Sequence, residues 1–501
     1  MPIHDRRYSF HQGFSMDNAL DFSKRSSFKR EILLEKFYPS RIILPMKMNY
    51  GEAAVPTVRV GEKVTIGQCV GAPNPGSFAV PVHSGISGEV KEIRNITLPN
   101  SVTCKAVVIE SDRKRTYHPS VYPRADVNIS ASKARGIVKD AGIVGMGGEG
   151  IPTIAKINMA RRSGVDRILV NCLQSEPYAN CDYMRISESP EYIVMGAVAL
   201  AGAVGVKRID FLIPDSRKEE IAALQNAMQM SAGDYSGFIF NFKYFKDRFP
   251  QGYYALVAKA LYGVDLGEGE TLESRCKAVM FNCSTVYSCW EAIADNMPLS
   301  SRIISISGDD EPGHNVLVPI GTPVSEILNN VNSNIKTSKK LIWGNCLTGL
   351  EIKDPDNTPV IKTTSAISVI SRKEFPTSPC IRCFQCEDAC PMGLEPALLH
   401  NLLKRGLEFR AQDEGIRKCI ACGSCSYVCP AAIDLTGVIA SYAQKMNKNP
   451  EQPDKLGFTE HTKINIGSVS LLETFEEDEE YQAEEGRDDN MVLPFEGGKP
   501  I

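Results

Sequence analysis

Eight of the sixteen cysteines fall into two short blocks of identical spacing. The first block reads Cys380-x2-Cys383-x2-Cys386-x3-Cys390-Pro, and the second reads Cys419-x2-Cys422-x2-Cys425-x3-Cys429-Pro. This spacing is typical of paired [4Fe–4S] clusters, in which the fourth cysteine of each block binds the cluster of the other block. We therefore predict that cluster I is bound by Cys380, Cys383, Cys386 and Cys429. Cluster II is then bound by Cys419, Cys422, Cys425 and Cys390.

The spacing itself has a physical reason. Three thiolates three residues apart can surround one face of a cubane from a single tight loop, so the last ligand must come from elsewhere in the chain. Pro391 and Pro430 cannot donate a backbone amide, which suits the start of a helix. Structural zinc is the alternative, but it needs only pairs of cysteines and no exchanged fourth ligand. A disulfide framework is typical of small secreted domains, and we expect no secretory segment in this long chain.

The bulk composition predicts an ordinary folded protein of several domains. The chain has 501 residues, of which 43% are hydrophobic and 23% are charged. The longest nearly uncharged apolar stretch, residues 192–206, is shorter than the ~20 residues that span a bilayer. We therefore expect a packed helix there and no transmembrane segment. Basic residues do not cluster with aromatic residues, which argues against a nucleic-acid partner.

Negative charge is concentrated near the C-terminal end. Residues 473–489 contain ten acidic side chains and one arginine. The whole chain carries −4 and this segment −9, so the rest of the chain carries +5. We predict that residues 449–501 form a disordered, solvated acidic tail.

Residue patterns divide the remainder into further domains. Residues 1–38 are expected to form an irregular arm. Short apolar runs separated by Gly and Pro predict a sandwich of short strands over residues 39–117, with strands at 42–44, 57–60, 80–82, 90–93 and 106–109. The stretches 58–64 and 87–90 resemble barrel-sandwich hybrids of the lipoyl type, but residues 72–78 contain no lysine for a swinging cofactor. A structural role is therefore expected for this domain.

Residues 118–298 alternate between helical and strand patterns, which predicts a parallel α/β unit. Helices are expected at 131–139, 192–204 and 218–230, and strands at 167–171 and 208–213. Residues 299–365 follow as a predicted small β-grasp domain, built from the segments 302–306, 315–319 and 325–331. In residues 366–448, two helices are expected within the 28 residues between Cys390 and Cys419. That connection indicates an α-helical ferredoxin domain.

A glycine-rich loop precedes a predicted helix that begins near Thr153. Its glycines permit close approach of the backbone to a phosphate, and a helix start offers amides to an anion. The candidate phosphate-binding glycines are Gly145, Gly147, Gly148 and Gly150.

Together, these features resemble the C subunit of Rnf-type electron-transport complexes, a family related to the flavin-binding subunit of respiratory complex I. The resemblance covers about residues 40–445 and includes the barrel-sandwich motif, the glycine-rich loop with Pro152-Thr153, and the two cysteine blocks. It also includes Asn171 with Ser175-Glu176-Pro177-Tyr178, then Pro250-Gln251-Gly252, and the segments 315–316 and 320–323.

The resemblance implies a peripheral subunit on the cytoplasmic face of the cell membrane. Such complexes couple electron flow between ferredoxin and NAD⁺ to translocation of Na⁺ or H⁺, so the implied partners are other members of the complex and, indirectly, ferredoxin. It also implies a Rossmann-like domain over residues 118–298 that holds FMN and receives NADH, and an SLBB-like β-grasp domain. The cofactor-binding residues implied for this domain are the four glycines, Lys156, Asn171 and Glu176.

Four features depart from the family pattern in the presumed nucleotide pocket. Glu149 replaces a small residue and would compete with a phosphate for the same amides. Ile151 replaces a Phe, Gln174 replaces an acidic residue, and Tyr253-Tyr254 follow Gly252 where the family has an acidic residue. These departures predict a weakened or absent NADH site. The alternatives are a relay subunit that serves a cytochrome or a quinone-like carrier, or a soluble flavin and iron–sulfur reductase such as a cobalamin reductase.

The other reactive residue types show no catalytic arrangement. Eight further cysteines have no metal-like spacing, and we expect them to be buried as small hydrophobic residues. His83, His118, His314 and His400 are isolated in sequence and are expected to be structural. No Ser–His–Asp or paired-carboxylate arrangement predicts a hydrolytic site, so no catalytic residue is assigned.

Overall fold

The computed structural model describes residues 8–9, 14–15, 37–174, 176–230, 237–267, 269–308, 313–331, 339–371 and 376–446. Most of the predicted N-terminal arm, and the predicted acidic tail at 449–501, lie outside the described residues.

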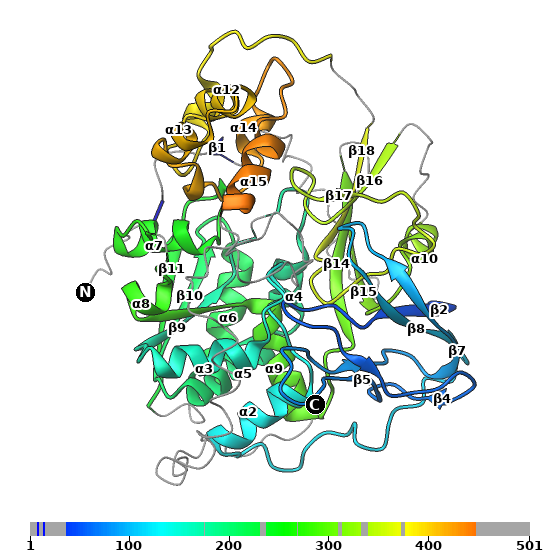
Figure 1. Ribbon diagram of the computed structural model, residues 1–501. Coiled ribbons are helices and arrows are strands. Elements are labelled where there is room, and N and C mark those ends of the chain that lie inside the picture. Colours follow the sequence, from blue (N-terminus) through cyan, green and yellow to red (C-terminus); the bar gives the residue numbers. More distant parts are fainter. Residues whose placement is uncertain are drawn as a thin grey trace.

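Two small antiparallel sheets form the N-terminal β domain, drawn in blue in Figure 1. One sheet has the order β2 (Arg41–Pro45), β8 (Thr103–Ser111), β7 (Gly88–Thr97) and β4 (Lys63–Val64). The other has the order β3 (Val55–Pro56), β5 (Cys69–Ala72) and β6 (Val82–His83). Val and Ile residues of β2, β7 and β8 are buried, and in β2 the successive residues Ile42 and Ile43 are both buried.

Two predicted strands of this domain are displaced. The strand expected at 57–60 is wrong, because residues 59–62 form a turn closed by Arg59 N donating to Glu62 Oε2 at 3.0 Å, with Gly61 at φ +87°. The strand lies at Val55–Pro56 instead. The strand expected at 80–82 begins only at Val82.

The central domain contains a four-stranded parallel sheet in the spatial order β11 (Ile239–Phe245), β10 (Arg208–Pro214), β9 (Arg167–Asn171) and β13 (Ala278–Asn282). Because β9 comes first in the chain, the order is 3-2-1-4. Side chains alternate between its faces, so Ile168 and Val170 join one core while Leu169 joins another. The predicted strands at 167–171 and 208–213 are confirmed.

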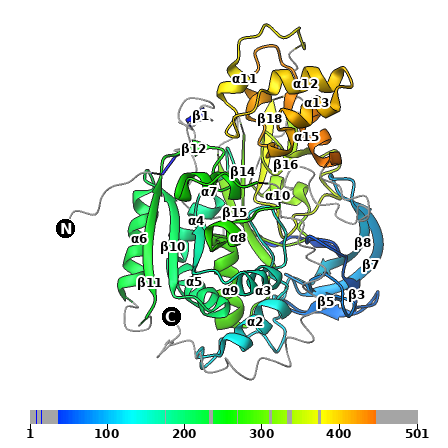
Figure 2. The same ribbon diagram turned by 60° about the vertical axis from the view of Figure 1, so that its left-hand side comes forward.

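Helices cover both faces of this sheet (Figures 1 and 2). The larger core contains residues of α2 (Ala131–Asp140), α3 (Thr153–Arg162), α5 (Pro190–Val204), α6 (Lys218–Met230) and α9 (Cys283–Asp295). The opposite core contains residues of α7 (Tyr254–Tyr262) and α8 (Leu272–Cys276). The three predicted helices of this region are confirmed. The apolar stretch 192–206 lies mostly within α5, which is buried as expected.

A third domain is a five-stranded mixed sheet. Its strand order is β15 (His314–Pro319), β14 (Ser301–Gly308), β18 (Ala366–Ser371), β16 (Lys339–Trp343) and β17 (Leu350–Glu351). The segment expected at 325–331 is mainly the helix α10 (Val324–Asn330).

One buried lysine joins three of these domains. Lys362 is 0% exposed, and its Nζ donates to the carbonyl oxygens of Pro81 and Gly142, each at 2.7 Å. Burial lowers the pKa of Lys362 to about 7. Its own carbonyl accepts a hydrogen bond from the buried guanidinium of Arg302. These contacts fix the β domain and the glycine-rich segment against the third domain.

The cysteine blocks lie in a separate helical domain at the top of Figure 1. The first block contains α11 (Gln385–Asp388), and the second block contains α14 (Ser424–Tyr427). Between them lie α12 (Pro396–Lys404) and α13 (Glu408–Asp413), which confirms the two predicted helices, and a 3-10 turn at Ile416–Lys418. Helix α15 (Leu435–Met446) packs against α12 around a small core that includes Leu399 and Ile439.

Among the described residues, no helix combines the length and apolar character needed to cross a membrane.

A tight contact between α5 and α9 makes a prediction about stability. A Cβ added at Gly196 would lie 2.1 Å from the Val286 carbonyl oxygen, whereas one added at Gly136 in α2 meets no atom within 4 Å. We expect Gly196→Ala to lower the free energy of unfolding by about 1–3 kcal/mol through overpacking. Gly136→Ala should instead raise it by up to about 1 kcal/mol, because alanine favours a helix. Thermal unfolding of both variants measures this, and equal effects would contradict the close packing.

Candidate electron-transfer and nucleotide sites

Cysteines of both blocks line one cavity in the helical domain. Cys419, Cys422 and Cys425 of the second block meet Cys390 of the first, the set expected for cluster II. About 370 Å³ of space is unfilled, part of it open to solvent, and the other lining is mainly apolar, including Leu394, Leu399, Ile420 and Ile439. Residues far apart in the sequence are thus brought together as the exchanged arrangement requires.

Three of these sulfurs have polar neighbours within hydrogen-bond distance. The backbone N–H of Leu394 donates to Cys390 Sγ at 3.4 Å. Ser424 Oγ lies 3.3 Å from Cys422 Sγ, and Thr436 Oγ1 lies 3.2 Å from Cys425 Sγ. Hydrogen bonds to ligand sulfurs are among the features that set a cluster's reduction potential.

The thiols of this cavity fit an iron–sulfur cluster. Burial raises the pKa of Cys422 to about 11 and that of Cys425 to about 12, and the charge of nearby Cys390 adds to both shifts. Four thiolates in an apolar cavity therefore need a strongly cationic partner. Iron bonded to each sulfur provides that charge. Within the described ranges, no three His, Cys, Asp or Glu side chains converge closely enough to share a single metal ion.

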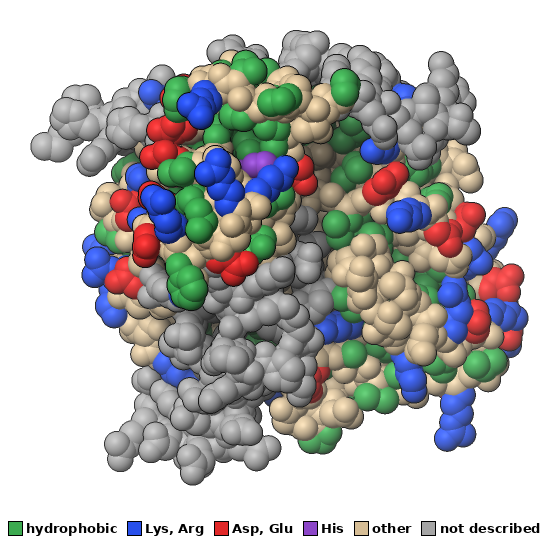
Figure 3. All heavy atoms as spheres, turned by 45° about the horizontal axis from the view of Figure 1, so that its top comes forward, with side chains coloured by type: hydrophobic (Ala, Val, Ile, Leu, Met, Phe, Trp, Pro, Cys, Tyr) green, Lys and Arg blue, Asp and Glu red, His purple; other side chains and the backbone are tan. Residues whose placement is uncertain are grey.

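The ligands expected for cluster I lie at the surface side of the domain. Burial raises the pKa of Cys386, and the charge of nearby Cys429 contributes, so these two residues of different blocks are neighbours. Cys380 and Cys383 are exposed. Beside them Ile381 is 68% exposed and Phe384 62% exposed. Figure 3 shows hydrophobic side chains lying among acidic and basic ones on the face that includes the top of the molecule.

A second cavity lies at the carboxyl ends of β9 and β13. It has about 470 Å³ of unfilled space, part of it open to solvent, and its lining includes Asn171 at the end of β9 and Asn282 at the end of β13. The chain leaves β9 toward β10 and β11 on one side and returns from β11 to β13 on the other side of β9, so the strand order reverses between β9 and β13. Ligands of open α/β sheets bind at such a reversal point.

The structure separates the seven predicted nucleotide-binding residues. Gly147, Asn171 and Glu176 line the cavity. A Cβ added at Gly150 would instead approach Thr363 and Asn49, so Gly150 permits packing between domains. The lining does not include Gly145, Gly148 or Lys156.

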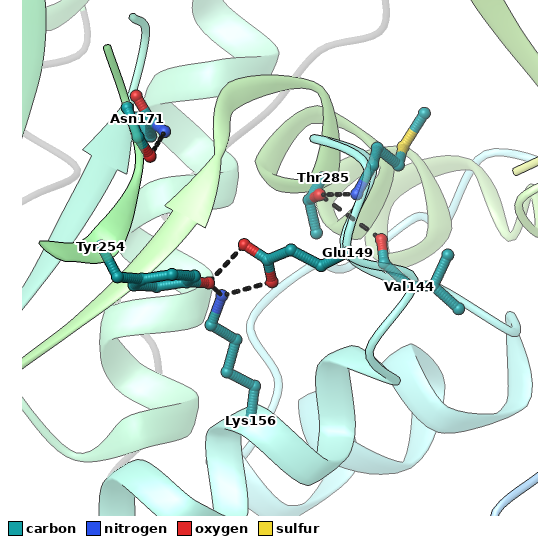
Figure 4. Close-up of polar contacts among 8 residues, drawn as sticks. Val144, Glu149, Lys156, Asn171, Tyr254 and Thr285 are labelled. Carbon is teal, nitrogen blue, oxygen red and sulfur yellow. Dashed lines mark hydrogen bonds and ion pairs between the residues drawn. The ribbon is translucent and has the colours of Figure 1, made fainter. Parts of the chain in front are cut away.

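Several amides of the glycine-rich loop are already hydrogen-bonded within the protein. Gly145 N donates to Ile151 O at 2.8 Å, and Gly150 N donates to Gly145 O at 3.0 Å. Met146 N donates to Thr285 Oγ1 at 2.9 Å (Figure 4). The expectation that this loop offers its amides to a phosphate is therefore not met at these three positions.

A carboxylate of the loop pairs with the buried lysine behind it. Glu149 Oε2 lies 3.1 Å from Lys156 Nζ, and Lys156 is 5% exposed. The Tyr254 hydroxyl contacts both charged groups, as Figure 4 shows. Burial raises the pKa of Tyr254 well above its ordinary value, and the charge of Glu149 adds to the shift. Tyr254 therefore stays neutral and can donate to the carboxylate.

The remaining polar groups of the cavity largely bind one another. Asn171 Nδ2 donates to Gly252 O at 3.1 Å, and its Oδ1 accepts from Leu173 N at 3.0 Å. Burial raises the pKa of Glu176 to about 7. Gln174, which replaces the expected acidic residue, donates through Nε2 to Glu176 at 3.4 Å. The neutral amide thus gives Glu176 a donor where an acidic residue would have repelled it.

The sequence interpretation missed Asp182 as a cavity residue. Its carboxylate accepts from Asn282 Nδ2 at 2.8 Å and from Ser284 Oγ at 2.6 Å. A signal was available, because Asn282 ends a buried strand and caps α9, and Ser284 lies in the first turn of that helix. Polar residues at the carboxyl end of a parallel strand are candidates for a site.

Two aromatic residues, Phe249 and Tyr253, lie close to Cys422 of the cysteine cavity. Phe249 is fully buried and packs with Cys422, together with Leu347 and Ile420. Burial raises the pKa of Tyr253, and the charges of Cys422 and Glu176 both add to the shift. Tyr253 therefore lies within electrostatic range of the cysteine cavity and of the nucleotide-type cavity. Gly423 allows the approach, since a Cβ there would lie 2.9 Å from the Leu347 side chain.

Comparison with known proteins assigns domain types to three parts of the chain. Residues 8–114 match the RnfC barrel sandwich hybrid domain, residues 138–291 the Nuo51 FMN-binding domain, and residues 372–430 a 4Fe-4S dicluster domain. These matches confirm a multidomain chain that joins a barrel-sandwich hybrid, a mixed α/β domain and a two-cluster domain.

Two relatives are similar over most of the chain. The C subunit of the Na(+)-translocating ferredoxin:NAD(+) oxidoreductase complex of Acetobacterium woodii is 29% identical over 374 residues, covering 74% of this chain and 82% of the relative. The C subunit of the ion-translocating oxidoreductase complex of Rhodobacter capsulatus is 28% identical over 403 residues, covering 79% and 76%. A chain of the H2-reduced NAD+-reducing [NiFe]-hydrogenase shares 16% identity at a TM-score of 0.43, covering 63% of this chain and 54% of that chain, which is too weak a likeness to inform the fold.

The shared cavity predicts which cysteines act together. We expect Cys390→Ser and Cys425→Ser to abolish the same cluster signal, although they lie in different blocks. Cys386→Ser and Cys429→Ser should abolish the other signal. Each variant should retain about four of about eight irons. Iron counts and electron paramagnetic resonance (EPR) spectra of anaerobically prepared protein measure this, with Cys276→Ser as a control that keeps both signals. Loss of one cluster by both Cys386→Ser and Cys390→Ser would contradict the exchange.

Proposed function

Because this chain belongs to the family of C subunits of Rnf-type ion-translocating oxidoreductase complexes, we propose that it is the peripheral iron–sulfur electron-transfer subunit of such a complex. The complex couples electron flow between ferredoxin and NAD⁺, or another carrier, to translocation of Na⁺ or H⁺. One observation carries the proposal: Cys390 joins Cys419, Cys422 and Cys425 around a single cavity. Its partners are the other subunits of the complex and, indirectly, ferredoxin, at the cytoplasmic face of the cell membrane.

The residues of the chain have distinct tasks in this function. When bound, two [4Fe–4S] clusters supply one-electron chemistry. The eight cysteines of the two blocks hold them. Leu394, Leu399 and Ile439 keep water from the inner site, while the amide of Leu394 donates to a ligand sulfur. Burial and these donors are how the protein sets the potential.

The positions of the two cluster sites indicate a path for electrons from the surface of the molecule to its interior. Exposed Cys380 and Cys383 put cluster I at the surface, where a protein partner can approach. Cluster II lies inward, because Cys422 packs on buried Phe249 and acts on Tyr253. The chain thus connects an external partner with the cavity at the carboxyl ends of β9 and β13.

The finer domain assignments also belong to this proposal. The strand order 3-2-1-4 with all strands parallel supports a Rossmann-like domain over residues 118–298. The mixed five-stranded sheet with α10 supports a β-grasp domain over 299–365. The helices around both cysteine blocks support an α-helical ferredoxin domain over 366–448, and the β sandwich spans 39–117.

A second candidate function is a relay without a working FMN or NADH site. Glu149 is paired with Lys156, so a carboxylate of the protein holds the cation that would otherwise attract a phosphate. Glu273 lies nearby as well, and the charge of Lys156 lowers its pKa against the larger effect of burial. The carboxylate of Glu149 lies on the cavity lining, so this end of the cavity repels an anionic ligand. The outside carrier would then be a cytochrome or a quinone-like molecule.

Anaerobic preparation of the full chain tests the main proposal. We expect about eight irons and eight sulfides per chain, because each of two cubanes needs four of each. We also expect the chain to be recovered with membranes that contain the partner subunits, and to be released when those subunits are deleted. Zinc in place of iron, or about four irons, would contradict the proposal.

Flavin titration distinguishes the two candidates. We expect Glu149→Ala to bind FMN roughly tenfold more tightly than the unmodified chain, since removing the carboxylate frees Lys156, and tenfold is about 1.4 kcal/mol. Glu149→Gln keeps the volume of the side chain and removes only its charge, so it distinguishes an effect of charge from an effect of shape. The gain should vanish in the double variant Glu149→Ala with Lys156→Met. Stoichiometric FMN and NADH-dependent cluster bleaching in the unmodified chain would reject the relay.

A further inference from the structure

The two cysteine blocks differ in the residues that face their sulfurs. Aligning the blocks cysteine by cysteine puts Thr436 at the position of Ala397 and Ser424 at the position of Gln385. Cys386 accepts a hydrogen bond from the backbone amide of Ala397. At the corresponding place, Cys425 has the Thr436 hydroxyl at 3.2 Å. The second block thus has a side-chain donor where the first can offer only backbone.

Neighbouring hydrogen bonds orient the Thr436 hydroxyl toward the sulfur. Ser426 Oγ accepts from Thr436 N at 2.7 Å and donates to Thr436 Oγ1 at 2.9 Å, the shorter of its two contacts, since Asp434 Oδ1 lies 3.5 Å away. Because Thr436 Oγ1 already accepts from Ser426, its own proton is available to Cys425. A metal-bound thiolate has no proton to give, so Thr436 must be the donor. Thr436 is 7% exposed, which keeps water from replacing it.

Ser424 repeats this arrangement at a second sulfur. Its Oγ lies 3.3 Å from Cys422 Sγ, and the residue is fully buried. The same reasoning makes Ser424 the donor. Gln385, its counterpart in the first block, is exposed. The first block instead has Glu387 and Asp388 directly after Cys386, in the first turn of α11.

We propose that Thr436 and Ser424 are positioning residues that raise the reduction potential of cluster II relative to cluster I. A reduced cluster carries one more negative charge on its iron and sulfur atoms. A hydroxyl that donates to a ligand sulfur stabilises that charge. The electron that leaves the outer site is therefore held at the inner one, next to Tyr253, with no bond made and no proton moved. This inference rests on the proposed binding of two clusters.

Potentiometric titration of the reconstituted full chain, followed by EPR, tests the inference. We expect two one-electron midpoint potentials, one for each cluster. Thr436→Val should lower one of them by about 40 mV, which corresponds to a roughly fivefold change in the reduction equilibrium. Ser424→Ala should lower the same midpoint potential. Thr436→Ser keeps the hydroxyl, so its midpoint potential should equal that of the unmodified chain. Ala397→Thr, which adds a hydroxyl at the matching position of the first block, should raise the other midpoint.

The outcomes separate this inference from the proposed function. If Thr436→Val and Ser424→Ala both retain eight irons and both midpoint potentials are unchanged, the inference is wrong. The proposed function is not affected by that result. A shift of one common midpoint by Thr436→Val and Ala397→Thr also overturns it. Fewer than eight irons in the unmodified chain reject the proposed function itself.

Discussion

Four thiols drawn from two separate stretches of chain around one apolar cavity are the constraint on which the rest of this molecule depends. Cys390 can meet Cys419, Cys422 and Cys425 only if the intervening helices return the chain to its starting point. The core around Leu399 and Ile439, where α12 packs on α15, performs that task. Since each block must supply a ligand to the other, neither half of the domain can hold its metal alone.

The same helical domain has to face the α/β domain in a defined way. Gly423 lets the second block come against Leu347, and Cys422 then packs on Phe249. Beneath this contact, Lys362 hydrogen-bonds to two other domains from a fully buried position. Replacing water around an ammonium with two carbonyl oxygens requires accurate placement of both partners. The β domain, the α/β domain and the third domain are therefore held in fixed positions relative to one another.

The sequence alone predicts the parts of the site that depend on the spacing of residues along the chain. The cysteine blocks predict their own pairing because the chemistry of a cubane fixes the number and type of ligands. The strands at 167–171 and 208–213 were predictable because buried parallel strands are continuous apolar runs. The turn at 59–62 was not, because it depends on a hydrogen bond that the Arg59 backbone amide donates to the Glu62 side chain.

Residues whose role depends on tertiary contacts were harder to predict. Glycine-rich sequence suggests a phosphate loop, yet the amides of Gly145 and Gly150 are bonded within the loop itself. Thr436 lies eleven residues beyond Cys425, and nothing in the local pattern indicates that its hydroxyl returns to that sulfur. Tyr254 follows the glycine-rich loop by more than a hundred residues, so its contact with Glu149 arises only from the fold.

The pairing of Glu149 with Lys156 has a consequence for competition. The Glu149 carboxylate, on the loop just before α3, faces the Lys156 ammonium of that helix at the high effective concentration of a tethered group. An incoming anion must displace this tethered carboxylate from Lys156, and Glu149 then keeps only the Tyr254 hydroxyl as a partner. Glu149 is therefore a built-in competitor for any anionic ligand that approaches Lys156.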